Sequence, residues 1–230
     1  MQREHEKQLM NLKQLEELEE LKVSQLKEHR NSLLYSFLQE ESSMCDAWFA
    51  EIYAQAWFGQ WRYHKYDVLN HTRRVVRNFM VKLQEFDDHF EGKITKYFHH
   101  EIDGVSKLLL TQLGLIFHDA WKQPIYEIQW NMRGHAAYAV QHQLADICQR
   151  FNLSDLQKTY LENIILYHDT PLEEDVNQEI REILQNNGVY VEALLISLAD
   201  LMACEWEKIQ EERIEKRREF VVSEMEKYVV

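Results

Sequence analysis

A histidine and an aspartate, His118 and Asp119, stand side by side directly after an apolar run. Leu109, Leu113 and Ile116 recur at helical spacing in that run, which predicts a core-facing helix that carries the pair at its end. Burying an ionised aspartate is costly unless a cation or several hydrogen bonds compensate its charge. Neutral imidazole and carboxylate are both ordinary ligands of zinc, iron and manganese, so a divalent metal would supply that compensation. For the pair taken alone, hydrogen bonding at the surface is the alternative.

Four further residues of the same kinds fall on inward helix faces or at helix starts elsewhere in the chain: His71, His135, His168 and Asp200. Asp200 is the only charge between Ala193 and Cys204, within a predicted helix from Tyr190 to Trp206 that is apolar on nearly every side. A buried carboxylate there needs a partner. Each residue alone has an ordinary explanation, such as a hydrogen-bonded core histidine. Together they predict a shared metal centre, whose nitrogen and oxygen donors favour zinc, iron, manganese or nickel over calcium.

The elements that must position these residues are predicted to be helices. Six glycines and two prolines in 230 residues disfavour a turn-rich β architecture, so we expect an all-α fold. Asp67 is placed as the N-cap or first-turn acid of a helix whose apolar face includes His71. Residues 84–104 are polar and are predicted as loop or surface, together with the pair His99 and His100.

The middle of the chain is predicted as a loop followed by two helices. Residues 121–134 contain a proline and a glycine and are expected to form a connecting loop. The next helix starts near His135 and continues to about Phe151. Ser154 and Gln157 form a capping-box signature for a helix that places His168 on its apolar face. Pro171 ends this helix, because the residue before a proline is pushed out of helical geometry.

The N-terminal part of the chain has a different character. Residues 1 to about 40 are rich in Glu, Lys, Gln and Leu, which predicts a long amphipathic helix packed on the domain. A coiled-coil arm that makes a homodimer is the alternative, although the leucines lack the alternating steps of a heptad. We therefore divide the chain into an N-terminal helical extension (1–42), a metal-binding helical domain (43–208) and a C-terminal helix or tail (209–230).

Charge and cysteine usage limit the class of protein. The net charge of −13, from 26 basic and 39 acidic residues, argues against a general nucleic-acid-binding surface, which needs lysine and arginine to neutralise phosphates. Cys45, Cys148 and Cys204 are far apart and form no CxxC pair, which is typical of reduced, mostly buried thiols. No apolar segment follows Met1 and no apolar stretch reaches 18 residues, so we expect a cytoplasmic protein without a membrane span.

In combination, the order His, His-Asp, His, His, Asp resembles the HD superfamily of helical metal-dependent phosphohydrolases, over roughly residues 60 to 208. The opening histidine motif of the HD domain attached to bacterial tRNA nucleotidyltransferases is similar to His64-Lys65-Tyr66-Asp67-Val68-Leu69-Asn70-His71-Thr72. The family's doublet and its following lysine match Phe117-His118-Asp119-Ala120-Trp121-Lys122. The closing aspartate matches Leu198-Ala199-Asp200, and the family's Gly-His-Glu resembles Gly134-His135.

Three departures from the family pattern bear on function. Pro124 comes one place late after the doublet, and Ala136 stands where the family usually has a glutamate. Nothing before residue 60 resembles a nucleotidyltransferase head, since no Gly-Ser followed by paired aspartates is present. Nucleotide addition is therefore expected to be absent.

The resemblance implies an HD-domain helical bundle that binds one or two divalent ions of zinc, manganese, iron, nickel or magnesium. By this resemblance, a first metal set consists of His71, His118, Asp119 and Asp200. His135 and His168 complete a second site, and Asp119 bridges the two. Lys122, one helical turn beyond His118 if the helix continues, would face a substrate phosphate as a point charge. The alternative is a surface lysine whose stem covers apolar residues while its ammonium is solvated.

The implied function is a metal-dependent phosphohydrolase that cleaves a phosphomonoester or phosphodiester, in a nucleotide or another small molecule, with metal-activated water. Asp119 would orient or deprotonate that water, and Asp119 and Lys122 are the expected catalytic residues. One alternative is a non-hydrolytic HD protein with a structural metal, whose N-terminal helix binds a partner. Another is a helical di-iron oxygenase with the same ligands. The substrate itself is not readable, because specificity lies in loops and pocket shape.

Overall fold

The computed structural model describes residues 49–56, 58–59, 66–129, 133–168, 178–204 and 209–228. Within these ranges the fold is all-α apart from one two-stranded hairpin, as the sequence predicted. The predicted N-terminal extension, residues 1–42, lies outside the described residues, as do Cys45 and the first two residues of the opening histidine motif. None of the helices in the described ranges is long and apolar enough to cross a membrane.

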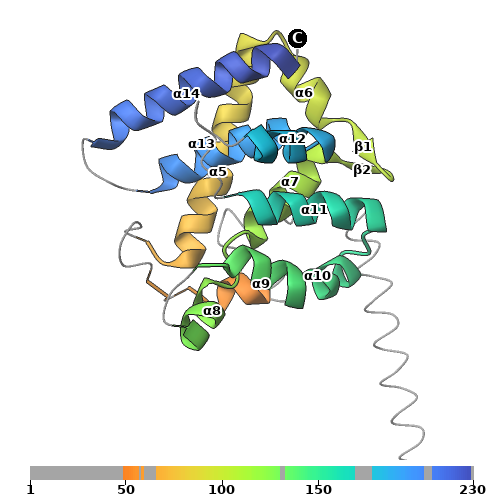
Figure 1. Cartoon of the computed structure of the whole chain (residues 1–230), viewed down its shortest axis with the longest axis vertical. Coiled ribbons are helices and arrows are strands. Elements are labelled where there is room, and N and C mark those ends of the chain that lie inside the picture. The colour runs from red at the N-terminus through yellow and green to blue at the C-terminus, as the bar shows by residue number, and fades with distance from the viewer. Residues whose placement is uncertain are drawn as a thin grey trace, which may run out of the picture.

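The elements follow one another in the order shown in Figure 1. The helices are α4 (Ala50–Tyr53), α5 (Val68–His89), α6 (Lys93–Phe98), α7 (Lys107–Phe117), α8 (Lys122–Gln129), α9 (His135–His142), α10 (Leu144–Arg150), α11 (Asp155–Tyr167), α12 (Gln178–Asn186), α13 (Tyr190–Ala203) and α14 (Ile209–Tyr228). Strands β1 (Glu101–Ile102) and β2 (Val105–Ser106) pair antiparallel between α6 and α7.

Helices α5 and α13 form the centre of the fold, and they cross in Figure 1. Asp67 is the N-cap of α5, as predicted, and its carboxylate accepts a hydrogen bond from the backbone N–H of Asn70 (2.8 Å). Nearly every residue of α13 from Tyr190 to Ala199 is buried, which agrees with its almost uniformly apolar sequence. Asn78 of α5 also donates a hydrogen bond to the carbonyl of Ala199 (3.2 Å). Residues 205–208, at the predicted end of this helix, lie outside the described ranges.

A second helix pair, α7 and α11, packs unusually closely at Gly114. A Cβ atom added to this glycine would lie 2.2 Å from Cγ2 of Ile164 on α11. The predicted capping box of α11 is confirmed. The hydroxyl of Ser154 accepts a hydrogen bond from the backbone N–H of Gln157, and the side-chain oxygen of Gln157 accepts one from the backbone N–H of Ser154. The capping box fixes where α11 begins, and the absence of a side chain at Gly114 allows α11 to pack closely on α7.

The prediction of a loop or surface segment at residues 84–104 is wrong for most of its length. Helix α5 continues to His89, and α6 and the hairpin follow. Apolar residues recur every fourth position through this polar stretch, and all four are buried: Phe86, Phe90, Ile94 and Phe98. Their burial stabilises helical structure around them. His99 and His100 are exposed, as predicted.

Two further boundaries differ from the predicted ones. The segment predicted as a loop at residues 121–134 contains α8, in whose first turn Pro124 is tolerated because it needs no hydrogen-bonded N–H there. The single helix predicted from His135 to Phe151 is interrupted at Gln143, whose φ of −131° and ψ of −24° separate α9 from α10. The apolar pattern continues across this break, which explains why the sequence did not reveal it.

Helix α14 packs on α13 and is anchored through a buried glutamate. Glu224 accepts a hydrogen bond from the hydroxyl of Tyr190 (2.6 Å) and pairs with Arg181 of α12 (3.3 Å). Val221 and Met225 of the same helix are fully buried. The first half of α14 is mostly exposed, as its charge-rich sequence predicted.

Candidate metal centre

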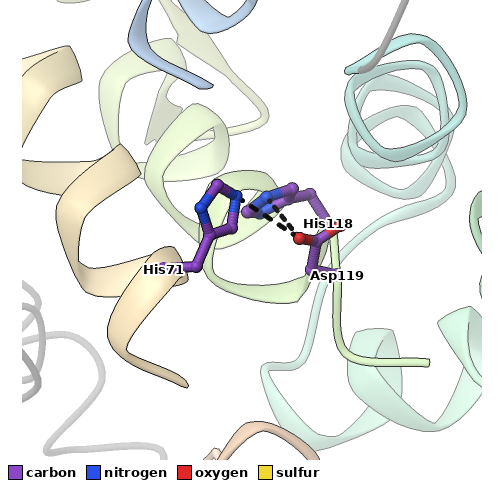
Figure 2. Close-up of side chains that lie close together, drawn as sticks. All are labelled: His71, His118 and Asp119. Carbon is purple, nitrogen blue, oxygen red and sulfur yellow. Dashed lines mark ion pairs between the residues drawn. The ribbon is translucent and has the colours of Figure 1, made fainter. Parts of the chain in front are cut away.

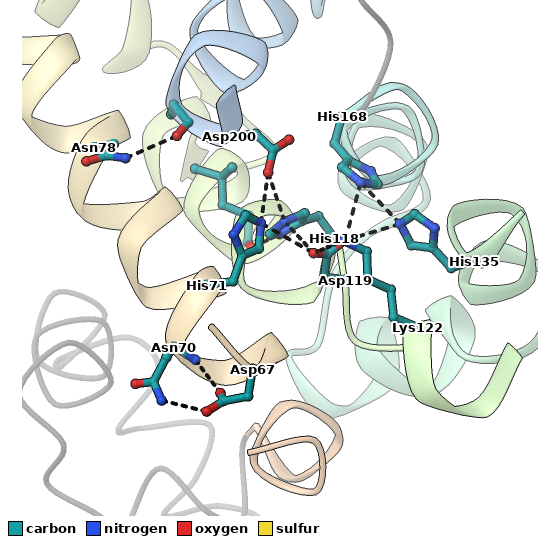
Figure 3. Close-up of polar contacts among 12 residues, drawn as sticks. Asp67, Asn70, His71, Asn78, His118, Asp119, Lys122, His135, His168 and Asp200 are labelled. Carbon is teal, nitrogen blue, oxygen red and sulfur yellow. Dashed lines mark hydrogen bonds and ion pairs between the residues drawn. The ribbon is translucent and has the colours of Figure 1, made fainter. Parts of the chain in front are cut away.

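The six predicted ligands converge from five helices. His71 lies in the first turns of α5, His118 is the C-cap of α7, and Asp119 follows in the adjoining turn. His135 opens α9, His168 is the C-cap of α11, and Asp200 lies in the last turns of α13. All are buried except Asp200, whose side chain keeps 23% of its surface exposed. Figure 3 shows their side chains meeting between these helices.

One group of donors surrounds the Oδ2 oxygen of Asp119. Nε2 of His118 lies 3.3 Å from Oδ2, and Nε2 of His71 lies 3.5 Å from it. Figure 2 shows this arrangement. His71 Nε2 also lies 2.9 Å from Oδ1 of Asp200, which itself is 3.9 Å from His118 Nε2. Donor atoms of His71, His118 and Asp119 all lie within 4.8 Å of one another, close enough to share one ion.

A second group surrounds the other oxygen of the same carboxylate. Nε2 of His135 lies 3.1 Å and Nε2 of His168 lies 3.5 Å from Oδ1 of Asp119. The two imidazole nitrogens are 3.2 Å apart. These three donors also lie within 4.8 Å of one another. Asp119 thus divides its two oxygens between two pairs of histidines.

Two of the histidines are oriented by the carbonyls of their own helices. Nδ1 of His118 lies 2.5 Å from the carbonyl oxygen of Leu115, and Nδ1 of His168 lies 2.7 Å from that of Ile165. A carbonyl only accepts, so Nδ1 carries a proton in both rings, and Nε2 is the nitrogen that faces Asp119. Both carbonyls belong to a last helical turn, where carbonyls lack partners within the helix. The same device therefore fixes a histidine at the end of α7 and of α11.

Burial and neighbouring charges act in opposite directions on the ionisation of the groups around Asp119. Burial lowers the pKa of His71 and of His135, which favours neutral imidazoles. Burial alone would raise the pKa of Asp119, but neighbouring His118 and Lys122 outweigh it and hold the pKa well below its usual range. For Asp200 the hydrogen bond from His71 likewise outweighs burial and lowers the pKa. Asp119 and Asp200 are therefore both favoured in the ionised form.

The donor set fits a divalent metal. Among the described residues, Nε2 of His118 and Oδ1 of Asp119 are buried polar atoms that make no hydrogen bond. Such atoms are costly unless something binds them. A cation beside Oδ2 would bind the nitrogen of His118, and a cation beside Oδ1 would bind that oxygen. The C-terminal ends of α7 and α11 carry the negative ends of their helix dipoles, which also favours positive charge here. The buried groups around Asp119 could therefore hold a metal ion on either side of this carboxylate.

Lys122 lies inside the centre and not on the surface. Helix α7 ends at Phe117, so Lys122 does not continue it but starts α8 after an intervening turn. Its Nζ atom lies 2.5 Å from Oδ2 of Asp119, and only 8% of the residue is exposed. The alternative of a solvated surface lysine is therefore wrong.

One residue that positions the centre was missed in the sequence. Gln55, at the end of α4, is buried and lies against the turn after Asp119. Its side-chain amide donates to the carbonyl of Ala120 and its oxygen accepts from the backbone N–H of Gln123 (3.0 Å). It thereby holds the turn that carries Asp119 and Lys122. No local signal marks this role, because Ala120 and Gln123, its two partners in that turn, lie more than sixty residues away.

Comparison with known proteins adds no family to this picture. No model of a known protein family matches the chain, and no curated protein matches it significantly. The resemblance to the HD superfamily stays a prediction from the order of the motifs.

Proposed function

We propose that this protein is a metal-dependent phosphohydrolase of the HD type, which cleaves a phosphoester in a nucleotide or another small molecule. One observation carries the proposal: a single buried carboxylate, Asp119, lies between two pairs of histidines whose nitrogens face it. Hydrolytic metal sites are built from such nitrogen and oxygen donors. The order of these residues along the chain is also the order of the HD motifs.

The residues of the centre divide the work in the following way. His71, His118, Asp119 and Asp200 would hold one ion, and His135, His168 and Asp119 would hold a second. A bound divalent ion supplies Lewis acidity, which activates water as the nucleophile and stabilises charge on a phosphoryl oxygen. Asp119 orients the attacking water or removes its proton. Asp200 is the exposed member of the set, so the phosphoester approaches on its side.

Lys122 supplies the positive charge that a substrate phosphate needs. Its ammonium is paired with Asp119. An ion bound to that carboxylate would balance its charge and leave the ammonium available for a phosphoryl oxygen. Burial around Lys122 excludes water and strengthens the contact once it forms. Substrate binding and metal binding are therefore linked through this side chain.

A second candidate function is a non-hydrolytic HD protein with a structural metal. It is favoured by Ala136, which is buried beside His135 where the family usually has a glutamate. The missing carboxylate weakens the second ion site or its water. In this reading the metal holds α5, α7 and α13 together, and the protein acts by binding a partner.

Element analysis of protein purified without added metal, combined with assays on an aryl phosphate and a bis-aryl phosphodiester, tests the proposal. We expect bound metal and hydrolysis in the wild type. Both should fall greatly in His118→Ala and Asp200→Asn, because each variant removes a donor from the first ion site. His99→Ala and His100→Ala are matched controls, since both histidines are exposed, and they should behave as the wild type.

Each remaining outcome points to a different reading. Metal without turnover on monoesters or diesters would support the structural role. A coloured preparation loaded with iron would support the oxygenase. Wild-type protein without metal, or normal metal content in both His118→Ala and Asp200→Asn, would show that the centre is wrongly assigned.

A further inference from the structure

Lys122 and Asp119 form a close, buried ion pair at the centre. Their atoms Nζ and Oδ2 lie 2.5 Å apart, and the side chains are 10% and 0% exposed. The oxygen that Lys122 contacts is the same oxygen that His71 and His118 face. The ammonium therefore lies on the side of Asp119 where the first ion would bind.

The other side of Asp119 differs. Its Oδ1 oxygen faces His135 and His168 and makes no hydrogen bond among the described residues. The ammonium of Lys122 thus lies on the Oδ2 side of the carboxylate, and two imidazoles lie on the Oδ1 side. An ion on the Oδ2 side meets a buried positive charge already in contact with its ligand.

We propose that Lys122 is a built-in counter-ion that competes with the metal for Asp119 and keeps the affinity of the centre moderate. The inference rests on the proposed function only in taking the centre as a metal site, and not on hydrolysis. Like charges a few ångströms apart repel strongly where water is excluded, and an ammonium beside a divalent ion is such a pair. Removing the charge of Lys122 should therefore tighten metal binding.

The same contact stabilises the protein before any metal binds. A buried ion pair that loses one partner leaves an uncompensated charge, which is strongly destabilising. The metal-free form of a Lys122 variant should therefore melt earlier than the wild type. Because the ion then replaces the lost charge, the rise in melting temperature on metal addition should be larger than in the wild type.

The direction of the change separates this role from a purely structural one. If Lys122 only orients Asp119 as a hydrogen-bond donor, its loss should weaken metal binding, since residues that orient ligands typically contribute ten- to a hundredfold in affinity. A competing counter-ion predicts the opposite sign. Affinity for the metal therefore decides between the two roles without any assay of turnover.

The test uses the full chain, stripped of metal with a chelator and titrated with zinc against a chromophoric competitor. Lys122→Met removes the charge and keeps the stem, and Lys122→Gln keeps a neutral donor toward Asp119. Lys82→Met is the matched control, because Lys82 also pairs at 2.5 Å with a carboxylate three residues away, Glu85, on α5. We expect both Lys122 variants to bind zinc at least about tenfold more tightly than the wild type. The Lys82 variant should be unchanged.

Unchanged or weaker zinc affinity in the two Lys122 variants would overturn the inference. So would variants that stay unfolded at saturating zinc, because Lys122 would then be needed for the fold itself. A variant that folds only with zinc supports it. If the wild type binds no zinc, both the inference and the proposed function fail. If the wild type binds zinc but hydrolyses no phosphoester, only the proposed hydrolysis fails.

Discussion

Replacing Gly114 by alanine tests whether the close approach of α7 and α11 at this position contributes to the stability of the fold. The new Cβ would lie 2.2 Å from Cγ2 and 2.9 Å from Cβ of Ile164. Ordinary carbon contacts lie at about 3.5–4.0 Å. Rotating the side chain of Ile164 relieves the first clash but not the second, so the two helix backbones must separate.

Two opposing terms decide the stability of Gly114→Ala. Alanine is about 1 kcal/mol more favourable than glycine inside a helix. Overpacking a core typically costs about 1–3 kcal/mol, and the contact with the Cβ of Ile164 places this site at the upper end of that range. The net loss should be about 1–2 kcal/mol. For a chain of this size it corresponds to a fall in melting temperature of about 2–8 °C.

Thermal unfolding followed by circular dichroism, together with guanidinium midpoints, measures this loss. The second background is Ile164→Gly, which removes both the Cγ2 and the Cβ atom that the new methyl group would meet. In that background Gly114→Ala should cost much less or become stabilising, because the helix propensity term remains. Wild-type stability of Gly114→Ala, or an equal loss in both backgrounds, would refute the steric explanation.

The other predictions concern charge and ligands. Burial raises the pKa of Glu51, but hydrogen bonds from Arg150 (2.8 Å for Nη1–Oε2) outweigh it and lower the pKa below the ordinary 4.5. The ion pair therefore contributes its full stabilisation above pH 4.5 and loses it as pH falls through the lowered pKa of Glu51. Arg150→Gln should thus lower the free energy of unfolding at pH 7 but hardly change it in strong acid. An equal loss of unfolding free energy at both pH values, measured by guanidinium denaturation, would contradict this. Glu192→Ala removes a fully buried carboxylate that accepts hydrogen bonds from two tyrosines and a lysine, and urea unfolding should show a loss of about 3–5 kcal/mol. Finally, element analysis should find less metal in Asp119→Asn than in His71→Ala or His168→Ala, because only Asp119 serves both groups; equal loss in all three variants would argue for a single site.

Features that depend on contacts within a few residues could be predicted from the sequence. Asp67 and Ser154 were recognised as helix starts because a capping side chain bonds to backbone only two or three residues away. The burial of His71 followed from its spacing among apolar neighbours, since a helix repeats every 3.6 residues. Most candidate ligands could therefore be identified from the sequence. Their convergence on one carboxylate was expected only because there were several of them and because their order resembles the HD motifs.

The sequence failed where contacts between distant segments decide. Helix α6 was hidden because its two buried residues, Ile94 and Phe98, stand in a polar stretch and are stabilised by packing on α5. The turn after α7 places Lys122 against Asp119, and Gln55 fixes that turn from 65 residues away. Nothing in the local pattern of charges or apolar residues encodes such a contact.

The carbonyl contacts of His118 and His168 make helix length a determinant of the centre. Each ring is the first residue beyond its helix and is held by the carbonyl three positions earlier. One residue inserted into α11 would turn every later side chain by about 100° and advance it about 1.5 Å. Substitutions on the outer face of α11 should thus be tolerated far better than a single insertion or deletion between Ser154 and His168. The spacing from cap to ligand is accordingly the property of this helix that evolution or design can change least.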